Sequence, residues 1–139
     1  MSNGLADRKP EHLRQDVREA WEAMQALCFA EGIDLLLTEG WRSPSRQDWL
    51  YASGRTRPGP ILTYARRGES SHNWTENGQP ASKAFDVCFI TQRNSTGKPI
   101  AISYDGPWGR VAQIAQECGL LWGGDWSAPK RDRPHFYVE

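Results

Sequence analysis

Two histidines and one aspartate lie in segments whose neighbours suit hydrolytic or metal chemistry. His72 follows Glu-Ser-Ser inside a long loop, and His135 begins an apolar segment directly after Asp-Arg-Pro. Asp86 lies within the apolar run 84–90, where a carboxylate is costly unless it is paired or bound to a cation. Two imidazoles and one carboxylate form a three-ligand set for a catalytic zinc ion and leave one coordination position for water.

Each of these residues also has an ordinary structural interpretation. A single histidine at a strand edge is more often a hydrogen-bonding residue than a metal ligand, and an aspartate inside a strand is often paired with a neighbour. The chain contains no H-E-x-x-H helix, so spacing alone does not select the metal site. The third histidine, His12, falls on the polar side of a predicted helix and is expected to be exposed.

Asp132 lies three residues before His135, with Pro134 between them. Proline biases the residue before it toward extended geometry, so the Asp132 carboxylate can lie near a metal held by His135 without binding it. A carboxylate in that position can take a proton from the attacking water and pass it to a leaving amine. The alternative is a surface ion pair of Asp132 with Arg131 or Arg133.

Hydrophobic periodicity and turn signals predict the elements that must position these residues. The predicted elements are a helix with apolar residues from Leu13 to Cys28, a strand over 33–38, a helix through about Ser53 that is capped by Ser43, a strand over 84–90, a helix from 105–107 to Gly119, and strands over 120–122 and 135–138. Residues 54–83 carry many Gly and Pro turn signals and are expected to form a long, functional loop.

This order of elements predicts an α+β fold, with helices packed on a small and mainly antiparallel sheet. Residues 1–139 are expected to form a single domain in which residues 1–10 are a flexible arm. Three cysteines lie far apart among apolar neighbours, which predicts buried free thiols rather than disulfides; they are Cys28, Cys88 and Cys118.

The composition argues against two classes of protein. The 17 Lys and Arg residues are balanced by 17 Asp and Glu residues, so no global positive charge favours nucleic-acid binding. No apolar run approaches the roughly 20 residues of a membrane span. The polar N-terminal segment lacks the apolar core of a signal peptide, so we expect a product made in the cytoplasm.

Arginine and tryptophan are unevenly distributed. Residues 42–67 contain six arginines and one acid, which indicates either a solvated basic face or a surface for an anionic substrate. Of the seven tryptophans, Trp21 and Trp41 are expected in the core. Trp74 and Trp126 flank the candidate site and are candidate substrate-binding walls, with core packing as the alternative.

Several motifs occur in order along the chain. They are Thr-Glu-Gly-Trp-Arg-Ser-Pro-Ser-Arg-Gln at 38–47, the segment 50–63, Ser-Ser-His-Asn-Trp at 70–74, Ala-Phe-Asp-Val at 84–87, Trp-Gly-Gly-Asp-Trp at 122–126 and Asp-Arg-Pro-His-Phe at 132–136. Together these motifs resemble the zinc D-alanyl-D-alanine carboxypeptidase and L-alanyl-D-glutamate endopeptidase family, whose VanY-like members and phage endolysins share a hedgehog/D,D-peptidase-like fold. The resemblance covers most of residues 33–138.

The resemblance implies a role for each matching residue. The zinc ligands are His72, Asp86 and His135. Asp132 is then the catalytic base, and Arg42 holds the substrate or polarises the scissile carbonyl. Ser70, two positions before the first ligand, lies near the substrate.

The same resemblance implies a zinc peptidase that acts on peptidoglycan stem peptides. The long form of the segment at 54–56 favours the endolysin-like branch, which cuts the L-alanyl-D-glutamate bond, over the carboxypeptidase branch, which removes the terminal D-alanine. We therefore expect a monomeric phage endolysin that reaches the cell wall through holin-type release.

Two alternatives belong to other classes. One is a catalytically inactive wall-binding module that keeps the zinc for structure, which the lack of a nearby fourth Cys or His ligand disfavours. The other is a nucleic-acid-binding domain that uses the basic stretch and tryptophan stacking, which the neutral total charge disfavours.

The chain departs from the family pattern in one place. The family usually has seven residues from the histidine ligand to the aspartate ligand, with glycine at the third, whereas here the step is fourteen. Residues 75–81 resemble an insertion, and Ser82 stands at the glycine position. Loop closure depends weakly on length, so the ligands can still meet. Beside the metal, the insertion is expected to form a lid or lengthen the groove.

Overall fold

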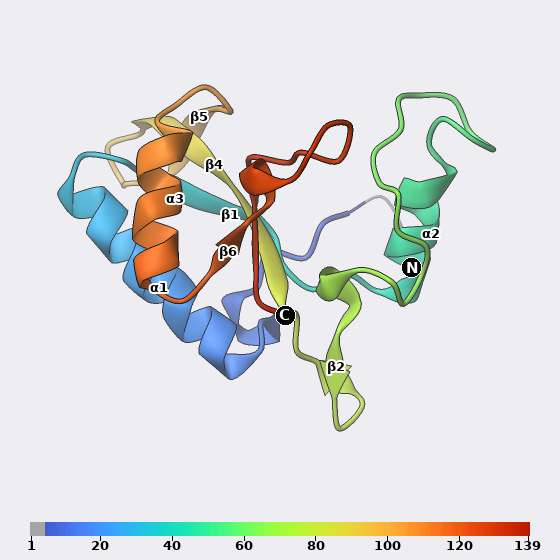
Figure 1. Cartoon of the computed structure of the whole chain (residues 1–139). Coiled ribbons are helices and arrows are strands. Elements are labelled where there is room, and N and C mark those ends of the chain that lie inside the picture. The colour runs from blue at the N-terminus through green and yellow to red at the C-terminus, as the bar shows by residue number, and fades with distance from the viewer. Residues whose placement is uncertain (1–4) are drawn as a thin grey trace.

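A five-stranded antiparallel sheet forms the centre of the computed structural model, which describes residues 5–139. Its strands are β1 (Leu35–Glu39), β4 (Ala84–Arg93), β7 (His135–Tyr137) and β6 (Leu121–Trp122) in this order, with β5 (Pro99–Ser103) paired to β4. Helices α1 (Gln15–Ala30) and α3 (Trp108–Glu117) cover one face, and α2 (Pro44–Ala52) lies at the opposite end of the molecule with the long loop that follows it (Figure 1). The predicted α+β fold is confirmed.

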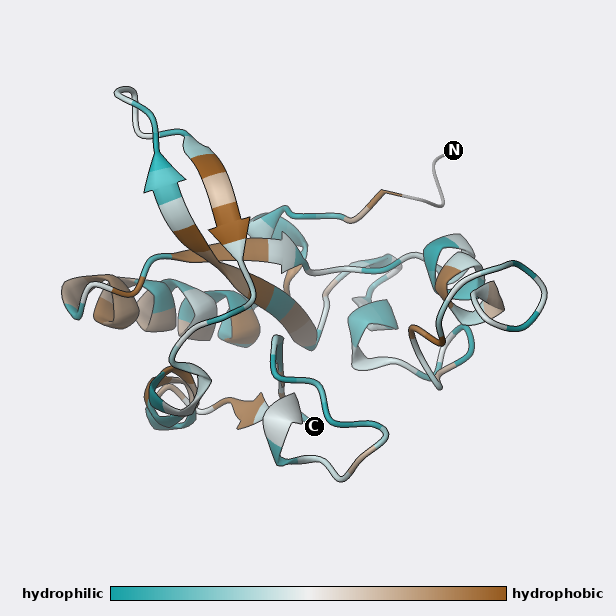
Figure 2. Cartoon of the chain, turned by 90° about the horizontal axis from the view of Figure 1, so that it is seen from above, coloured by the Kyte–Doolittle hydropathy of each residue, from teal (hydrophilic) through white to brown (hydrophobic). Residues whose placement is uncertain are grey.

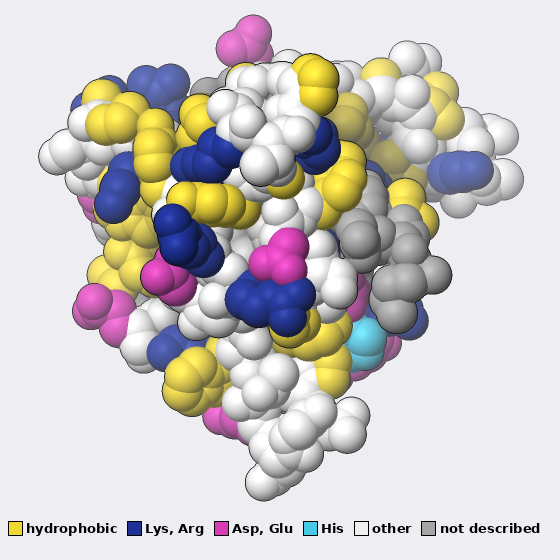
Figure 3. Space-filling model, turned by 90° about the vertical axis from the view of Figure 1, so that its right-hand side faces the viewer, with side chains coloured by type: hydrophobic (Ala, Val, Ile, Leu, Met, Phe, Trp, Pro, Cys, Tyr) yellow, Lys and Arg dark blue, Asp and Glu magenta, His cyan; other side chains and the backbone are white. Residues whose placement is uncertain are grey.

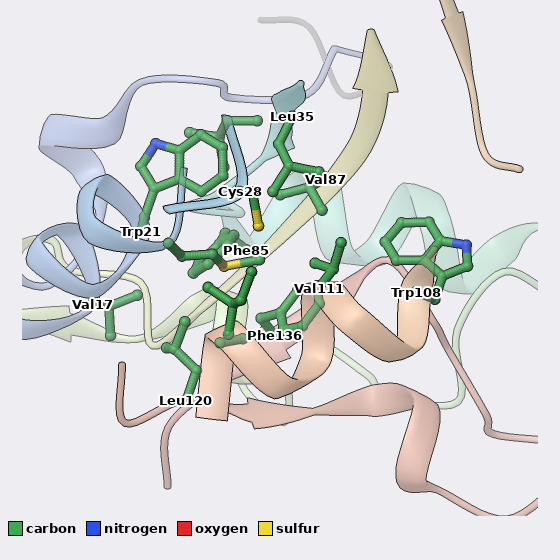
Figure 4. Packing of buried hydrophobic residues seen from close by; sticks show 14 of the residues in the cluster. Val17, Trp21, Cys28, Leu35, Phe85, Val87, Trp108, Val111, Leu120 and Phe136 are labelled. Carbon is green, nitrogen blue, oxygen red and sulfur yellow. The ribbon is translucent and has the colours of Figure 1, made fainter. Parts of the chain in front are cut away.

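The hydrophobic core lies between the sheet and the helices α1 and α3. Its members from these elements include Val17, Trp21, Met24, Cys28, Leu35, Phe85, Val87, Val111, Ile114 and Phe136 (Figure 4). The ring of Trp21 meets that of Phe85 edge to face, with centroids 5.4 Å apart. Hydrophobic residues concentrate in the sheet and in these helices, whereas the loops are mostly hydrophilic (Figure 2). Burial of this apolar surface is the main force that holds the sheet in place.

The predicted helices and strands are present, with shifts of up to three residues at their ends. Ser43 caps α2 as predicted, since its Oγ accepts from the backbone N–H of Arg46. Strand β5 was not predicted, and β4 extends three residues beyond Ile90. Within the described residues, no helix is long and apolar enough to cross a membrane.

Three expectations about burial need correction. Cys28 and Cys88 are buried free thiols, but Cys118 is only partly buried. Trp41 is half-buried and does not belong to the core cluster. His12 is half-buried rather than exposed, because it lies in the short turn η1 (Pro10–His12) before α1 and its Nδ1 is 2.5 Å from a carboxylate oxygen of Asp7.

The N-terminal arm predicted for residues 1–10 lies partly outside the described residues, which begin at Leu5. The described part is tied to the domain by a backbone hydrogen bond, because the N–H of Gly40 donates to the carbonyl of Asp7 at 2.7 Å. Asp7 also accepts from the N–H of Lys9. The bond from Gly40 joins the arm to the end of β1, whereas the bond from Lys9 lies within the arm.

The segment that resembles an insertion folds into a small hairpin of its own. Strands β2 (Thr75–Glu76) and β3 (Gln79–Pro80) pair antiparallel around the turn Asn77-Gly78. Both turn residues have positive φ, at 53° and 74°, which is the backbone of a tight hairpin turn. The hairpin projects away from the sheet (Figure 1).

Candidate metal and catalytic centre

The register of the sheet places Asp86 and His135 side by side. The two residues are directly opposite each other in the antiparallel pair β4–β7, and β1 brings Glu39 opposite Asp86 from the other side. Opposite residues of an antiparallel pair project on the same face of the sheet. Oδ1 of Asp86 accordingly lies 3.2 Å from Nδ1 of His135.

A capped turn brings His72 to the same place. In the short turn η2 (Ser71–Asn73), Oγ of Ser70 accepts from the N–H of His72, and the side chain of Asn73 accepts from the N–H of Ser70. Nδ1 of His72 lies 2.7 Å from the carbonyl oxygen of Gly40. A carbonyl only accepts hydrogen bonds, so Nδ1 carries a proton, and Nε2 is the nitrogen that faces the other two residues.

The three side chains fit a zinc ion. One ligand atom from each of His72, Asp86 and His135 lies within 4.8 Å of the others. A tetrahedral zinc site with ligand distances of about 2.1 Å has edges of about 3.4 Å. Nε2 of His72 is 3.3 Å from Nδ1 of His135 and 3.6 Å from Oδ2 of Asp86. The carbonyl of Gly40 supplies the partner that orients a metal-binding imidazole.

The cluster contains three ligand residues and no fourth among the described residues. Structural zinc sites usually fill all four positions with protein ligands, whereas catalytic sites keep one open. The donor set therefore has the composition of a catalytic site.

Asp132 lies beside this cluster and is held there by its backbone. Its N–H donates to the carbonyl of Gly123 at 2.9 Å. A Cβ on Gly123 would lie 2.5 Å from the carbonyl oxygen of Asp132, so a glycine is required for this close approach. Within the described part of the chain, Asp132 forms no ion pair with Arg131 or Arg133, which were its alternative partners.

The two carboxylates of the site differ in acidity. Burial and, second to it, the negative charge of Asp86 raise the pKa of Asp132 to about 6, although His135 and Arg42 act in the opposite direction. Burial also raises the pKa of Asp86, but the charges and hydrogen bonds of His72 and His135 outweigh burial and hold that pKa well below its usual value. Asp86 is thus suited to remain an ionised ligand, and Asp132 is suited to exchange protons near neutral pH.

Arg42 connects the cluster of His72, Asp86 and His135 to a buried polar network. Its guanidinium donates to Oε1 of Glu39 at 3.0 Å and to Oε1 of Gln47 at 3.2 Å. The same guanidinium lies 3.7 Å from Oδ2 of Asp86. Its buried Nε has no hydrogen-bond partner within residues 5–139. This network presents a fixed positive charge at the edge of the candidate site.

Glu39 is expected to be essential for the stability of this network. Its carboxylate accepts from both Arg42 and Arg46, and all three side chains are at most 13% exposed. Glu39→Ala should lower the free energy of unfolding by about 3–5 kcal/mol, because it leaves buried charges unpaired.

Urea denaturation of this variant checks the prediction. Asp34→Ala is the control, because it removes the more exposed pair of Asp34 with Arg93 and should cost about 1 kcal/mol or less. Equal losses of unfolding free energy in the two variants would show that the buried network stabilises the fold no more than an exposed ion pair does.

A large cleft opens beside the cluster. It has a volume of about 1020 Å³, and its walls include the metal cluster, Arg42, Ser70, Trp126, Asp132 and residues 61–65. A second depression of about 320 Å³ is lined by Arg8, Arg46 and Tyr104 among others. Asp86 and Asp132 line both depressions, so each of the two borders the candidate centre.

Comparison with known proteins identifies the family. A VanY-type D-alanyl-D-alanine carboxypeptidase model matches residues 10–93, and a second model with the same description matches residues 63–138. The peptidoglycan L-alanyl-D-glutamate endopeptidase CwlK of Bacillus subtilis is 38% identical over 96% of this chain and 78% of its own length. This chain belongs to the D-alanyl-D-alanine carboxypeptidase family.

Two solved structures share the fold of this chain. The L-Ala D-Glu endopeptidase ChiX of Serratia marcescens matches with a TM-score of 0.61 and 19% identity, over 99% of this chain and 89% of that chain. The LD-carboxypeptidase LdcB matches with a TM-score of 0.60 and 18% identity, over 91% of this chain and 58% of that chain. At these identities the likeness concerns the fold.

Of the three further residues predicted to bind substrate, two line the cleft and one does not. Ser70 lies in the wall beside His72, and the ring of Trp126 packs 4.9 Å from that of His135. Nε1 of Trp126 donates to the hydroxyl of Tyr137. Trp74, by contrast, is not among the cleft residues and lies against Lys83, with Nζ 4.2 Å from the ring centroid.

The hairpin at residues 75–80 does not line the cleft either. The expectation that this segment forms a lid or lengthens the groove is therefore wrong in this structure. The reason is the tight turn at Asn77-Gly78, which closes the segment on itself.

The basic stretch 42–67 is not a continuous binding surface. Arg55 and Arg57 stack on aromatic rings, Arg67 pairs with Asp48, and of the six arginines only Arg42 lines the cleft. On the face that carries α2 and the following loop, Lys and Arg side chains form separate patches among acidic, hydrophobic and neutral groups (Figure 3). Local packing thus uses most of these arginines.

Sequence reasoning missed four contributors to the site. Gly40 orients His72, and Glu39 orients Arg42. Both belong to the Thr-Glu-Gly-Trp-Arg motif, so this motif could have indicated them from the sequence. The other two are the cations Lys130 and Arg131, which line the cleft just before Asp132.

Proposed function

We propose that this protein is a zinc-dependent peptidase that hydrolyses the L-alanyl-D-glutamate bond of peptidoglycan stem peptides. The observation that carries the proposal is the arrangement of Asp132 beside the open His72, Asp86 and His135 set, inside a large cleft. The named activities of the Bacillus subtilis and Serratia marcescens relatives support the choice of bond. Bound to the three ligands, zinc would acidify a water molecule and polarise the scissile carbonyl.

Groups of the protein itself would supply proton transfer, charge stabilisation and orientation of the ligands. Asp132 accepts a proton from the attacking water and delivers it to the leaving nitrogen, which its raised pKa suits. Arg42, fixed by Glu39 and Gln47, opposes the negative charge that develops on the carbonyl oxygen. His72 stays in the ligating tautomer because Gly40 accepts its Nδ1 proton.

An endopeptidase suits the cleft better than a carboxypeptidase does. Both depressions border Asp86 and Asp132, which leaves room for a peptide to extend beyond the bond that is cut. Removal of a terminal D-alanine, the activity in the family description, needs little space beyond that bond. We further propose that the enzyme acts on the cell wall, as an endolysin of the type that its segment 50–63 resembles.

Digestion of purified muropeptides, followed by mass spectrometry, tests the proposed function. The zinc-loaded protein should separate L-alanine from D-glutamate, and a chelator should abolish the reaction, with recovery when zinc is returned. Release of D-alanine alone would support the carboxypeptidase alternative. Muropeptide binding without any cleavage would contradict both activities and support a non-catalytic wall-binding module.

A further inference from the structure

The cleft contains two cations that have no carboxylate partner. Lys130 and Arg131 line its wall and are exposed, and neither forms an ion pair with any residue from 5 to 139. The third cation, Arg42, is paired with Glu39. Two unpaired positive charges inside a cleft favour an anionic group of the substrate there.

The loop that carries these cations is held by hydrogen bonds. The N–H of Trp126 donates to the carbonyl of Gly123, and the N–H of Lys130 donates to the carbonyl of Ser127. Nε of Arg131 donates to the carbonyl of Trp126 at 3.3 Å, which leaves its two terminal nitrogens available. The loop therefore presents both charges immediately before Asp132.

The chemistry of the stem peptide identifies a matching anion. When the L-alanyl-D-glutamate bond breaks, the leaving nitrogen is that of D-glutamate, and the free α-carboxylate is attached to the same carbon as this nitrogen. Asp132 must reach the nitrogen to protonate it, so the carboxylate lies close to the residues beside Asp132. An arginine can bind a carboxylate with two parallel hydrogen bonds, and a lysine adds a point charge.

We propose that Lys130 and Arg131 bind the free α-carboxylate of D-glutamate and make the enzyme prefer it over its amide, D-isoglutamine. The proposal rests on the proposed function and names the specificity-determining residues of the same site. Tyr64 forms part of the surrounding wall, with its ring 6.0 Å from Nζ of Lys130.

Two synthetic muropeptides that differ only at this α-carboxyl, free or amidated, test the proposal with zinc-loaded enzyme. The double variant Lys130→Gln/Arg131→Gln should lose about ten- to hundred-fold in kcat/KM on the free acid, mainly through KM, and less than about threefold on the amide. Lys98→Gln, an exposed lysine outside the cleft, removes the same kind of charge and should change neither rate.

The outcomes separate this proposal from the proposed function. Wild-type enzyme that cuts neither peptide refutes the proposed function. Wild-type enzyme that cuts both peptides equally well overturns only the carboxylate proposal. Equal losses on both peptides in the double variant, or no loss on the free acid, also overturn it, because the two side chains would then not distinguish acid from amide.

Discussion

Replacement of Asp132 by alanine or asparagine is expected to leave zinc binding intact and to reduce kcat by about 10²- to 10⁴-fold, the usual contribution of a general base. The carboxylate is not one of the three ligands, and its raised pKa suits proton transfer rather than coordination. The measurements are muropeptide turnover and zinc affinity by calorimetry, made on the same preparations.

Asp125→Asn provides a matched control for this variant. Asp125 also lines the cleft, but it is exposed, and within residues 5–139 its carboxylate accepts a single long bond, 3.4 Å, from Gln116. Its replacement should change kcat by less than about threefold. Full activity of Asp132→Ala would exclude Asp132 as the base. Loss of zinc from that variant would instead indicate that Asp132 is part of the metal site.

His72→Gln should lower zinc affinity by more than about 100-fold and remove activity. Loss of a residue that only orients a ligand typically costs 10- to 100-fold in metal affinity, and loss of a ligand itself should cost more. His12→Gln is the control, because His12 pairs with Asp7 outside the cluster. Zinc affinity by calorimetry and circular dichroism of the metal-free proteins separate lost binding from lost folding.

Asp86→Asn repeats this test with a side chain that has nearly the same shape and volume as aspartate but no negative charge. It should also lose zinc, because a neutral amide is a poor substitute for an ionised ligand. Wild-type zinc affinity in both His72→Gln and Asp86→Asn would refute the assignment of these side chains as ligands.

Much of the fold follows from local patterns in the sequence. The apolar spacing from Leu13 to Cys28 predicts the buried face of α1, and Ser43-Pro44 predicts the start of α2. Strand β5 was missed because its two isoleucines point to solvent, at 54% and 50% exposure, so it lacks the buried residues that mark a strand. Its pairing with β4 stabilises it instead.

The candidate site depends on long-range pairing that spacing does not reveal. Asp86 and His135 are far apart in sequence, and only the register of β4 with β7 makes them neighbours. The family motifs therefore predicted Asp86 and His135 as metal ligands, whereas hydrophobic periodicity alone was also compatible with ordinary structural roles for both. The basic stretch was less informative, because tertiary partners such as Asp48 decide which arginines remain available to a ligand.

Anomalous diffraction at the zinc absorption edge, from crystals of zinc-loaded protein, tests whether His72, Asp86 and His135 bind one zinc ion. One zinc peak is expected about 2.0–2.2 Å from Nε2 of His72, Nδ1 of His135 and a carboxylate oxygen of Asp86, with no fourth protein ligand. A peak bound elsewhere, a fourth protein ligand at the predicted position, or no peak at all in fully loaded protein would contradict it.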